Sequence, residues 1–224
     1  TQGVSSAASD VYKRQVLAAD EEDQSYQLEL TQPLSGQVTF EDVSFAYRSD
    51  QPLIQNFSVQ VQPGETVAIV GPTGAGKTTL INLLMRFYDV SQGSISLDGI
   101  NIKEMTQADL HRQIGYVPQK GLLFSGTIAS NIAFGVDDLD NKKMAEAADI
   151  AHASEFIQEK DKGYQARIAQ GGNNVSGGQK QRLSIARAIA KDPSIYLFDD
   201  SFSALDYRTC LLYTSPSPRD LSTS

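Results

Sequence analysis

Short runs of apolar and β-branched residues alternate with segments of helical periodicity along the middle of the chain. The runs predict strands at residues 38–40, 43–47, 57–61, 66–70, 94–97, 114–117 and 194–198. The helical pattern predicts helices at residues 79–86, 142–152, 154–160 and 178–190. This order predicts an α/β core that is interrupted by a helical insert.

The strand predicted at Thr66–Val70 and the helix predicted at Thr79–Arg86 enclose a glycine-rich loop. In such a loop, backbone N–H groups and a helix N-terminus form an anion cradle, because glycine removes the Cβ atoms that would block it. Lys77 then reaches the β- and γ-phosphates, and the hydroxyl of Thr78 ligates Mg²⁺. The loop fits the pattern G-x-x-x-x-G-K-[ST] and reads Gly71, Pro72, Thr73, Gly74, Ala75, Gly76, Lys77 and Thr78. The order of strand, loop and helix favours a nucleotide site over an ordinary turn.

A second glycine-rich segment, Val175–Gln179, comes just before the helix predicted at 178–190. The Ser176 hydroxyl and the amides of Gly177 and Gly178 can face a γ-phosphate from the N-terminal end of that helix. One short chain does not easily fold both cradles onto one phosphate. Asp199 ends the apolar run 194–198, where it can hold Mg²⁺, although a lone aspartate at a strand end is more often a turn residue.

Composition narrows the class of partner. The chain has 224 residues with 40% hydrophobic content, which suits one globular domain with its own core. The net charge of −8 argues against a nucleic-acid surface, since phosphate backbones attract clustered Lys and Arg. We expect protein partners, and we find neither a long apolar run typical of a membrane span nor a signal peptide.

Both ends of the chain differ from the middle and lack apolar periodicity. Asp10–Gln15 can be encoded by GAT GTG TAT AAG AGA CAG, whose reverse complement, read one frame over, encodes Cys210–Ser215. We therefore interpret residues 1–15 and 210–224 as translated sequencing adapters and expect them to be disordered. Cys210 is the only cysteine, so no disulfide is expected. Residues 16–36, with an acidic run at Asp20–Asp23, are expected to be a linker.

Together these motifs resemble the nucleotide-binding domain of an ABC transporter over Gly36–Arg208. The resemblance implies an α/β fold, with a P-loop NTPase (RecA-like) core, an antiparallel β subdomain and an inserted α-helical subdomain. It places the domain at residues 37–209 and the helical subdomain at about 120–190. ATP and Mg²⁺ are the implied cofactors.

The resemblance also implies roles for single residues. Tyr47, which by pattern alone is a packing aromatic, matches the tyrosine that stacks on adenine. Gln119 matches the residue that senses Mg²⁺ and the attacking water, and Ser203–Asp206 match a segment of the dimer interface. The implied catalytic residues are Asp200, Gln119 and Lys77. The implied metal ligands are Thr78, Gln119 and Asp199. Nucleotide binding is assigned to residues 71–79, which end at Thr79, and to Tyr47, Ser176, Gly177, Gly178, Gln179 and Asp206.

Details point to one branch of the family. The run 119–128 with Asn131 and Ile132 is similar to exporters whose membrane and nucleotide domains share one polypeptide. The implied assembly is a head-to-tail dimer with ATP between one subunit's phosphate loop and the other's Ser176–Gln179 segment. It would lie at the cytoplasmic face of a bacterial cell membrane, with a transmembrane domain joined through residues 16–36.

The sequence departs from the family pattern in three places. The residue after the metal-binding aspartate is usually glutamate, but here it is Asp200, whose shorter side chain predicts slow hydrolysis. Such a replacement resembles the degenerate site of heterodimeric exporters, so the expected partner is a different half-transporter. Ala169–Gly172 replaces an acidic segment thought to touch the membrane domain. The switch histidine expected after Asp199 is missing, which leaves the activity of this chain alone open.

Two other functions remain open at this point, and a third is argued against. Asp200 also fits a nucleotide-gated regulatory module with negligible turnover. A stand-alone importer ATPase would carry the same motifs. A DNA-repair or chromosome-maintenance ATPase shares this type of head but has long coiled coils between its two halves, whereas only about a hundred residues separate the two cradles here.

Overall fold

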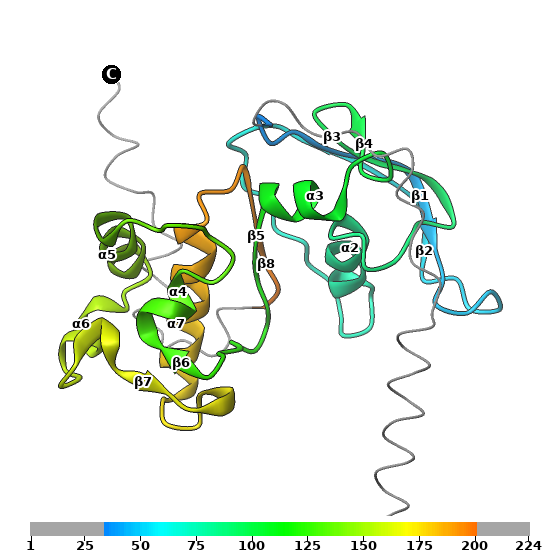
Figure 1. The fold of residues 1–224 in the computed structure, drawn as a ribbon. Coiled ribbons are helices and arrows are strands. Elements are labelled where there is room, and N and C mark those ends of the chain that lie inside the picture. The colour runs from blue at the N-terminus through cyan, green and yellow to red at the C-terminus, as the bar shows by residue number, and fades with distance from the viewer. Residues whose placement is uncertain (1–33, 201–224) are drawn as a thin grey trace, which may run out of the picture.

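The computed structural model describes residues 34–200, and Figure 1 shows two packed regions joined by a pair of strands. One region contains a four-stranded antiparallel sheet in the order β2-β1-β3-β4. Its strands are β1 (Val38–Phe45), β2 (Ile54–Val61), β3 (Gln92–Leu97) and β4 (Ile100–Asn101). Helices α2 (Lys77–Leu84) and α3 (Gln107–Gln113) pack against one face of this sheet. Buried side chains of these strands and helices form one hydrophobic core.

The first two predicted strands are one strand in the structure. Residues 38–40 and 43–45 both belong to β1, which pairs with β2 and β3 on either side. Its register shifts between Phe40 and Val43, and Asp42 in that interval has a φ of 47°. The prediction of two separate strands was wrong, because the polar pair between the two apolar runs is accommodated as a bulge within one strand. Tyr47 lies beyond the end of β1.

Two parallel strands lie between the two regions. β5 (Ile114–Val117) and β8 (Ile195–Phe198) pair in register, with Ile114 opposite Ile195 and Val117 opposite Phe198. Both were predicted from short apolar runs, and both are confirmed to within one residue. The N–H of Asp199 continues this pairing by donating to the Val117 carbonyl at 3.0 Å. The end of β8, where Asp199 and Asp200 follow, is therefore fixed on β5.

The strand predicted at Thr66–Val70 does not form. Within residues 34–200 no strand pairs with this run, and its side chains lie at the surface, with Val70 88% exposed. A strand needs a neighbour to accept its backbone hydrogen bonds, and apolar character alone does not supply one. The glycine-rich loop is thus preceded by an extended segment without ladder pairing.

The second region is mainly helical and has its own hydrophobic core. The helices predicted from periodicity are present, each shifted at its ends by a few residues, and a small two-stranded sheet joins them. No helix within the described part of the chain is long and apolar enough to cross a membrane. The elements are β6 (Gly126–Thr127), α4 (Ile128–Ile132), α5 (Asn141–Ile150), α6 (Ser154–Gln158), η1 (Gly163–Gln165), β7 (Arg167–Ile168), η2 (Gln170–Gly172) and α7 (Gly177–Ala190).

A polar pair, Asn131 and Arg187, connects α4 to α7. The Asn131 side chain is almost fully buried and bonds both backbone groups of Phe124 and the Thr127 carbonyl, at 2.8–3.0 Å. Arg187 of α7 donates to the Asn131 and Leu122 carbonyls at 2.8 and 2.9 Å and to the Asn131 side chain at 3.1 Å. Its guanidinium also lies over the ring of Phe124. These contacts hold the segment after Gln119 against the long helix α7.

Candidate nucleotide site

The glycine-rich loop leads directly into α2. Gly76 is the N-cap of this helix and has a φ of 88°, a left-handed conformation that residues with a Cβ rarely adopt. The Lys77 ammonium folds back and donates to the carbonyls of Gly71 and Pro72, each at 2.8 Å. The loop residues Gly71–Ala75 are exposed. A cation and the N-terminal end of a helix thus face the surface together, which is the arrangement that binds phosphate.

The first turn of α2 contacts the end of β8. The Thr78 hydroxyl donates to an Asp199 carboxylate oxygen at 3.0 Å, across 121 residues of sequence. Burial raises the pKa of Tyr116 on β5, and the negative charge of nearby Asp199 raises it further. The phosphate loop and the strand-end aspartate are therefore brought together, as the sequence predicted for two ligands of one metal ion.

Gln119 and Asp200 form a second pair at the same strand ends. The Gln119 amide donates to the Asp200 carboxylate at 3.0 Å. Asp200 has a φ of 45°, which is uncommon for a residue with a side chain. The segment around Gln119 also contacts α7. The Gln181 amide donates to the Pro118 carbonyl at 3.1 Å, and a Cβ on Gly121 would lie 2.7 Å from the Lys180 carbonyl. The close approach of these backbones requires glycine at position 121.

Tyr47 lies near the N-terminal end of α2. Its hydroxyl is 3.2 Å from the hydroxyl of Thr79, which is buried in the first turn of the helix. Its ring packs edge-to-face with Phe45 and Tyr88, and half of the side chain is exposed. The structure thus connects the tyrosine to the helix that follows the phosphate loop.

The second glycine-rich segment begins α7. Ser176 is the N-cap, and its hydroxyl accepts from the Gln179 N–H at 3.2 Å while the Gln179 side chain accepts from the Ser176 N–H at 3.1 Å. This reciprocal capping box was readable in the sequence as S-x-x-Q, but the sequence analysis missed it. Ser176 and Gly177 are exposed at the helix end. Figure 1 shows that α7 begins beside β7, across β5 and β8 from α2.

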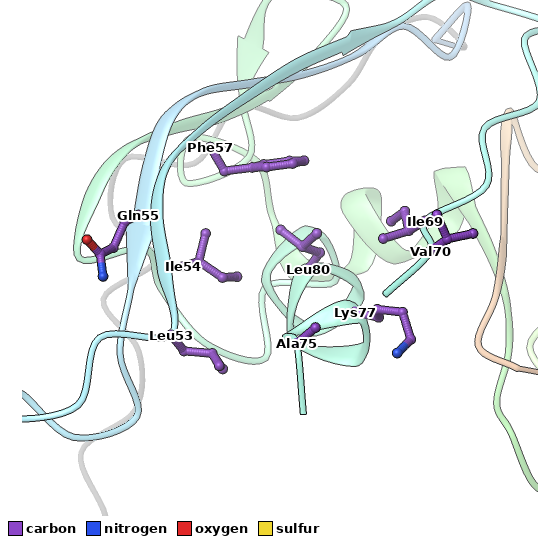
Figure 2. Close-up of a pocket in the computed structure, with 9 residues that line it drawn as sticks. All are labelled: Leu53, Ile54, Gln55, Phe57, Ile69, Val70, Ala75, Lys77 and Leu80. Carbon is purple, nitrogen blue, oxygen red and sulfur yellow. The ribbon is translucent and has the colours of Figure 1, made fainter. Parts of the chain in front are cut away.

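A cavity of about 300 Å³ lies between β2, the run that precedes the phosphate loop, and the start of α2. Figure 2 shows side chains of β2 on one side of it, Ile69 and Val70 on the other, and Leu80 between them, while the Lys77 ammonium points away. Its lining is mostly aliphatic, which suits packing rather than the binding of a triphosphate. The lining residues are Leu53, Ile54, Gln55, Phe57, Ile69, Val70, Ala75, Lys77 and Leu80.

The residues present fit a magnesium ion. Mg²⁺ in nucleotide sites takes one or two carboxylates, together with hydroxyl, water and phosphate oxygens. Asp199 and Thr78 supply a carboxylate and a hydroxyl 3.0 Å apart, and Gln119 and Asp200 lie at the same strand ends. No group of three or more His, Cys, Asp or Glu side chains gathers within residues 34–200. One carboxylate and one hydroxyl side by side suit a metal ion that substrate phosphates would also bind.

One predicted site residue is not among the residues that the structure describes. Asp206, with Ser203–Asp206 as a whole, falls outside the described residues. Two contacts of the site were not predicted: the packing of Tyr88 on Tyr47 and the attachment of the Gln119 segment to α7. A single sequence carried no signal for either, because both join residues that are distant along the chain.

Comparisons with known proteins agree with this geometry. Residues 54–203 match the ABC transporter family. The chain is 45% identical over 194 residues to a fatty acid ABC transporter ATP-binding/permease protein of Mycobacterium bovis, covering 86% of this chain and 31% of that protein. It is 42% identical over 192 residues to an ATP-dependent lipid A-core flippase of Saccharophagus degradans, covering 86% and 33%.

A solved structure is also similar. A bacterial Atm1-family ABC exporter with ATP bound superimposes with a TM-score of 0.79 at 39% identity, covering 89% of this chain and 35% of that one. The chain thus spans about a third of the length of the relatives it matches. The fold is that of a P-loop NTPase domain with an antiparallel sheet and a helical region. By motif, geometry and sequence identity, this chain belongs to the ABC transporter family.

Proposed function

We propose that this chain is the ATP-binding and ATP-hydrolysing motor of an ABC exporter. The observation that carries the proposal is the hydrogen bond between Thr78 and Asp199, which joins the phosphate loop to the end of β8. Beside it, Gln119 and Asp200 form the second polar pair. One cation, a hydroxyl, an amide and two carboxylates are thereby grouped at one edge, as phosphoryl transfer from ATP requires.

Each group has a separate task in the proposal. Lys77 and the amides of the phosphate loop bind the β- and γ-phosphates, and Thr78 and Asp199 hold Mg²⁺. Bound there, Mg²⁺ neutralises charge on the β- and γ-phosphate oxygens. The Asp200 carboxylate orients and polarises the attacking water, and the Gln119 amide holds that carboxylate through the bond at 3.0 Å. Tyr47 stacks on adenine.

The experiment compares Lys77→Ala and Asp199→Asn with the unmodified full-length protein. Removing the ammonium should weaken MgATP binding, since it removes a charge-assisted contact to the phosphates. Asp199→Asn should lower the affinity for MgATP more than that for ATP in EDTA. Lys160→Ala is the matched control, because Lys160 lies after α6 in the helical region. Unchanged MgATP binding in both site variants would overturn the proposal.

We further propose that two chains form a head-to-tail dimer. The exposed Ser176 and Gly177 at the start of α7 are separated from the phosphate loop of the same chain by β5 and β8. A second subunit places such a helix end on the γ-phosphate without refolding either chain. The domain 37–209, with its helical part at about 120–190, would then work with a transmembrane domain at the cytoplasmic face of a bacterial membrane. Several relatives combine ATP-binding and permease functions in one protein, which supports this arrangement.

A second function is favoured by Asp200. Its carboxylate is one methylene shorter than the glutamate usual at this position, so ATP would be bound well and hydrolysed slowly. In a heterodimer the partner would then supply the competent site, and Ser176–Gln179 of this chain would complete it. The alternative is a regulatory module in which neither site turns over. Single-turnover hydrolysis with the partner present separates the two, because a heterodimeric motor shows one fast site and a regulatory module none.

A further inference from the structure

Tyr88 lies in the turn after α2, and its ring packs on Tyr47. The helix ends at Leu84, and Arg86, with a φ of 53°, reverses the chain. The N–H of Phe87 closes this turn by donating to the Asn82 carbonyl at 2.9 Å. Two successive aromatic rings therefore leave the turn toward different neighbours. Phe87 packs on His111, and Tyr88 packs on Tyr47.

The rings of Phe45, Tyr47 and Tyr88 form a closed triangle. The centroid distances are 4.9 Å from Phe45 to Tyr47, 5.1 Å from Tyr47 to Tyr88 and 5.8 Å from Phe45 to Tyr88. Both neighbours stand nearly perpendicular to the Tyr47 ring, at 85° and 89°. The triangle is almost equilateral, so Phe45 and Tyr88 approach Tyr47 from neighbouring directions. About half of Tyr47 remains exposed, at 51%.

Tyr47 lies outside the ladder pairs of β1, whose last pair joins Phe45 to Ile54. Tyr47 lies past the end of β1, next to the isolated bridge between Arg48 and Gln51. Its hydroxyl is near that of Thr79, which fixes one point of the ring but leaves rotation about that point. Phe45 and Tyr88 remove this rotation, since a ring in contact with two perpendicular neighbours cannot turn without losing both contacts.

We infer that Tyr88 is a positioning residue that holds the plane of Tyr47 for stacking on the adenine of ATP. The inference rests on the proposed adenine contact of Tyr47. Tyr88 acts through Tyr47, so it affects recognition of the base and leaves recognition of the phosphates alone. The loop that follows α2 thereby contributes to the base site, while the turn that precedes α2 contributes the phosphate site.

The test separates base from phosphate. The full-length protein is titrated by calorimetry with the non-hydrolysable analogue AMP-PNP and with inorganic tripolyphosphate, both with Mg²⁺. The quantity compared is the dissociation constant of tripolyphosphate divided by that of AMP-PNP, so weaker recognition of the base lowers this ratio. Tyr88→Leu should weaken AMP-PNP binding by about two- to tenfold, the factor that an aromatic pair of this geometry contributes, and leave tripolyphosphate unchanged. Tyr88→Phe keeps the ring and should keep the ratio of the unmodified protein.

Phe87→Ala is the matched control, because Phe87 is the adjacent aromatic, is similarly exposed and contacts His111 instead of Tyr47. It should leave the ratio unchanged. If Tyr88→Leu weakens both ligands equally, or if Phe87→Ala lowers the ratio as much, Tyr88 acts through the fold and the inference is overturned. Tyr47→Ala separates the two levels. A ratio unchanged by Tyr47→Ala removes the proposed adenine contact itself, whereas a ratio lowered by Tyr47→Ala but not by Tyr88→Leu removes only the role of Tyr88.

Discussion

Replacing Asp200 with glutamate tests whether one missing methylene limits hydrolysis. The Asp200 carboxylate accepts from Gln119 at 3.0 Å, so its present position is set by a defined partner. A glutamate at position 200 extends the carboxylate by about 1.5 Å, the length of one carbon–carbon bond. A catalytic group misplaced by about 1 Å loses about 10²-fold in rate, and a general base contributes about 10²- to 10⁴-fold. Asp200→Glu should therefore raise kcat about 10²-fold, which corresponds to about 2.7 kcal/mol in the barrier.

The assay is phosphate release by the full-length protein in a dimer whose other site has been inactivated, so that only the Asp200 site is measured. The KM for ATP should change by less than about threefold, because the phosphates are bound by the loop and by Lys77 rather than by Asp200. Asp200→Asn is the control and should alter an already slow rate only slightly. A fast unmodified enzyme that loses its activity in Asp200→Asn would show that the aspartate is a competent base, and the reasoning from side-chain length would fail.

Three further predictions concern stability, each measured by unfolding of the purified chain. Burial raises the pKa of Asp98, but hydrogen bonds from Ser35 and Gln37 together outweigh it and hold this pKa below its usual 3.8. The stabilisation that ionised Asp98 provides is therefore complete above that pH and is lost as the pH falls through the lower folded value. The stability difference between the unmodified chain and Asp98→Asn should therefore shrink on acidification from pH 5, and a constant difference would contradict this. Arg187→Lys loses the guanidinium group that makes three hydrogen bonds and should lower the free energy of unfolding by about 2 kcal/mol. An unchanged unfolding midpoint would show that these hydrogen bonds do not stabilise the fold. Gly121→Ala forces the chain away from the Lys180 backbone and should cost about 2 kcal/mol, which lowers Tm by about 4–8 °C in a chain of this size. An unchanged Tm would mean that the close approach relaxes at no cost.

Elements whose signal is local were predictable from the sequence. The helix α7 carries its apolar period, its glycines and its capping residues within one segment, and the structure has it at Gly177–Ala190. The parallel strands β5 and β8 are short apolar runs, and they were placed to within one residue. The two-residue strands β6 and β7 were missed, because elements of that length have no periodicity to detect.

The run Thr66–Val70 shows the limit of this kind of reasoning. It has the composition of a buried strand, yet its side chains are exposed and it pairs with no strand within the described residues. Composition reports how well a side chain fits a pleated and buried surface, whereas strand formation depends on which other segment is available to pair. Sequence pattern therefore found the phosphate loop and its helix but not the backbone arrangement on the loop's N-terminal side.

The sequence predicted which residues form the candidate site better than it predicted which of them contact one another. Lys77, Thr78 and Asp199 follow from a loop pattern and a strand end, and the structure brings Thr78 and Asp199 together. The contact of Gln119 with Asp200 crosses 81 residues and depends on the parallel pairing of β5 with β8, which no local pattern specifies. Tyr88 has no motif of its own. Its place beside Tyr47 follows from the turn made by Arg86 after α2.

The position of Gln119 explains how the two glycine cradles of one chain are mechanically related. On one side its segment is attached to α7, through the bond from Gln181 to the Pro118 carbonyl and the close approach of Gly121 to Lys180. On the other side its amide reaches Asp200, which follows β8. The Thr78–Asp199 bond involves α2 and β8 and leaves α7 out. In the proposed site, a rotation of α7 on occupation of Ser176–Gln179 would therefore change the Gln119–Asp200 contact while the Thr78–Asp199 bond stays in place. The second cradle would then act on the Asp200 carboxylate rather than on the phosphate loop.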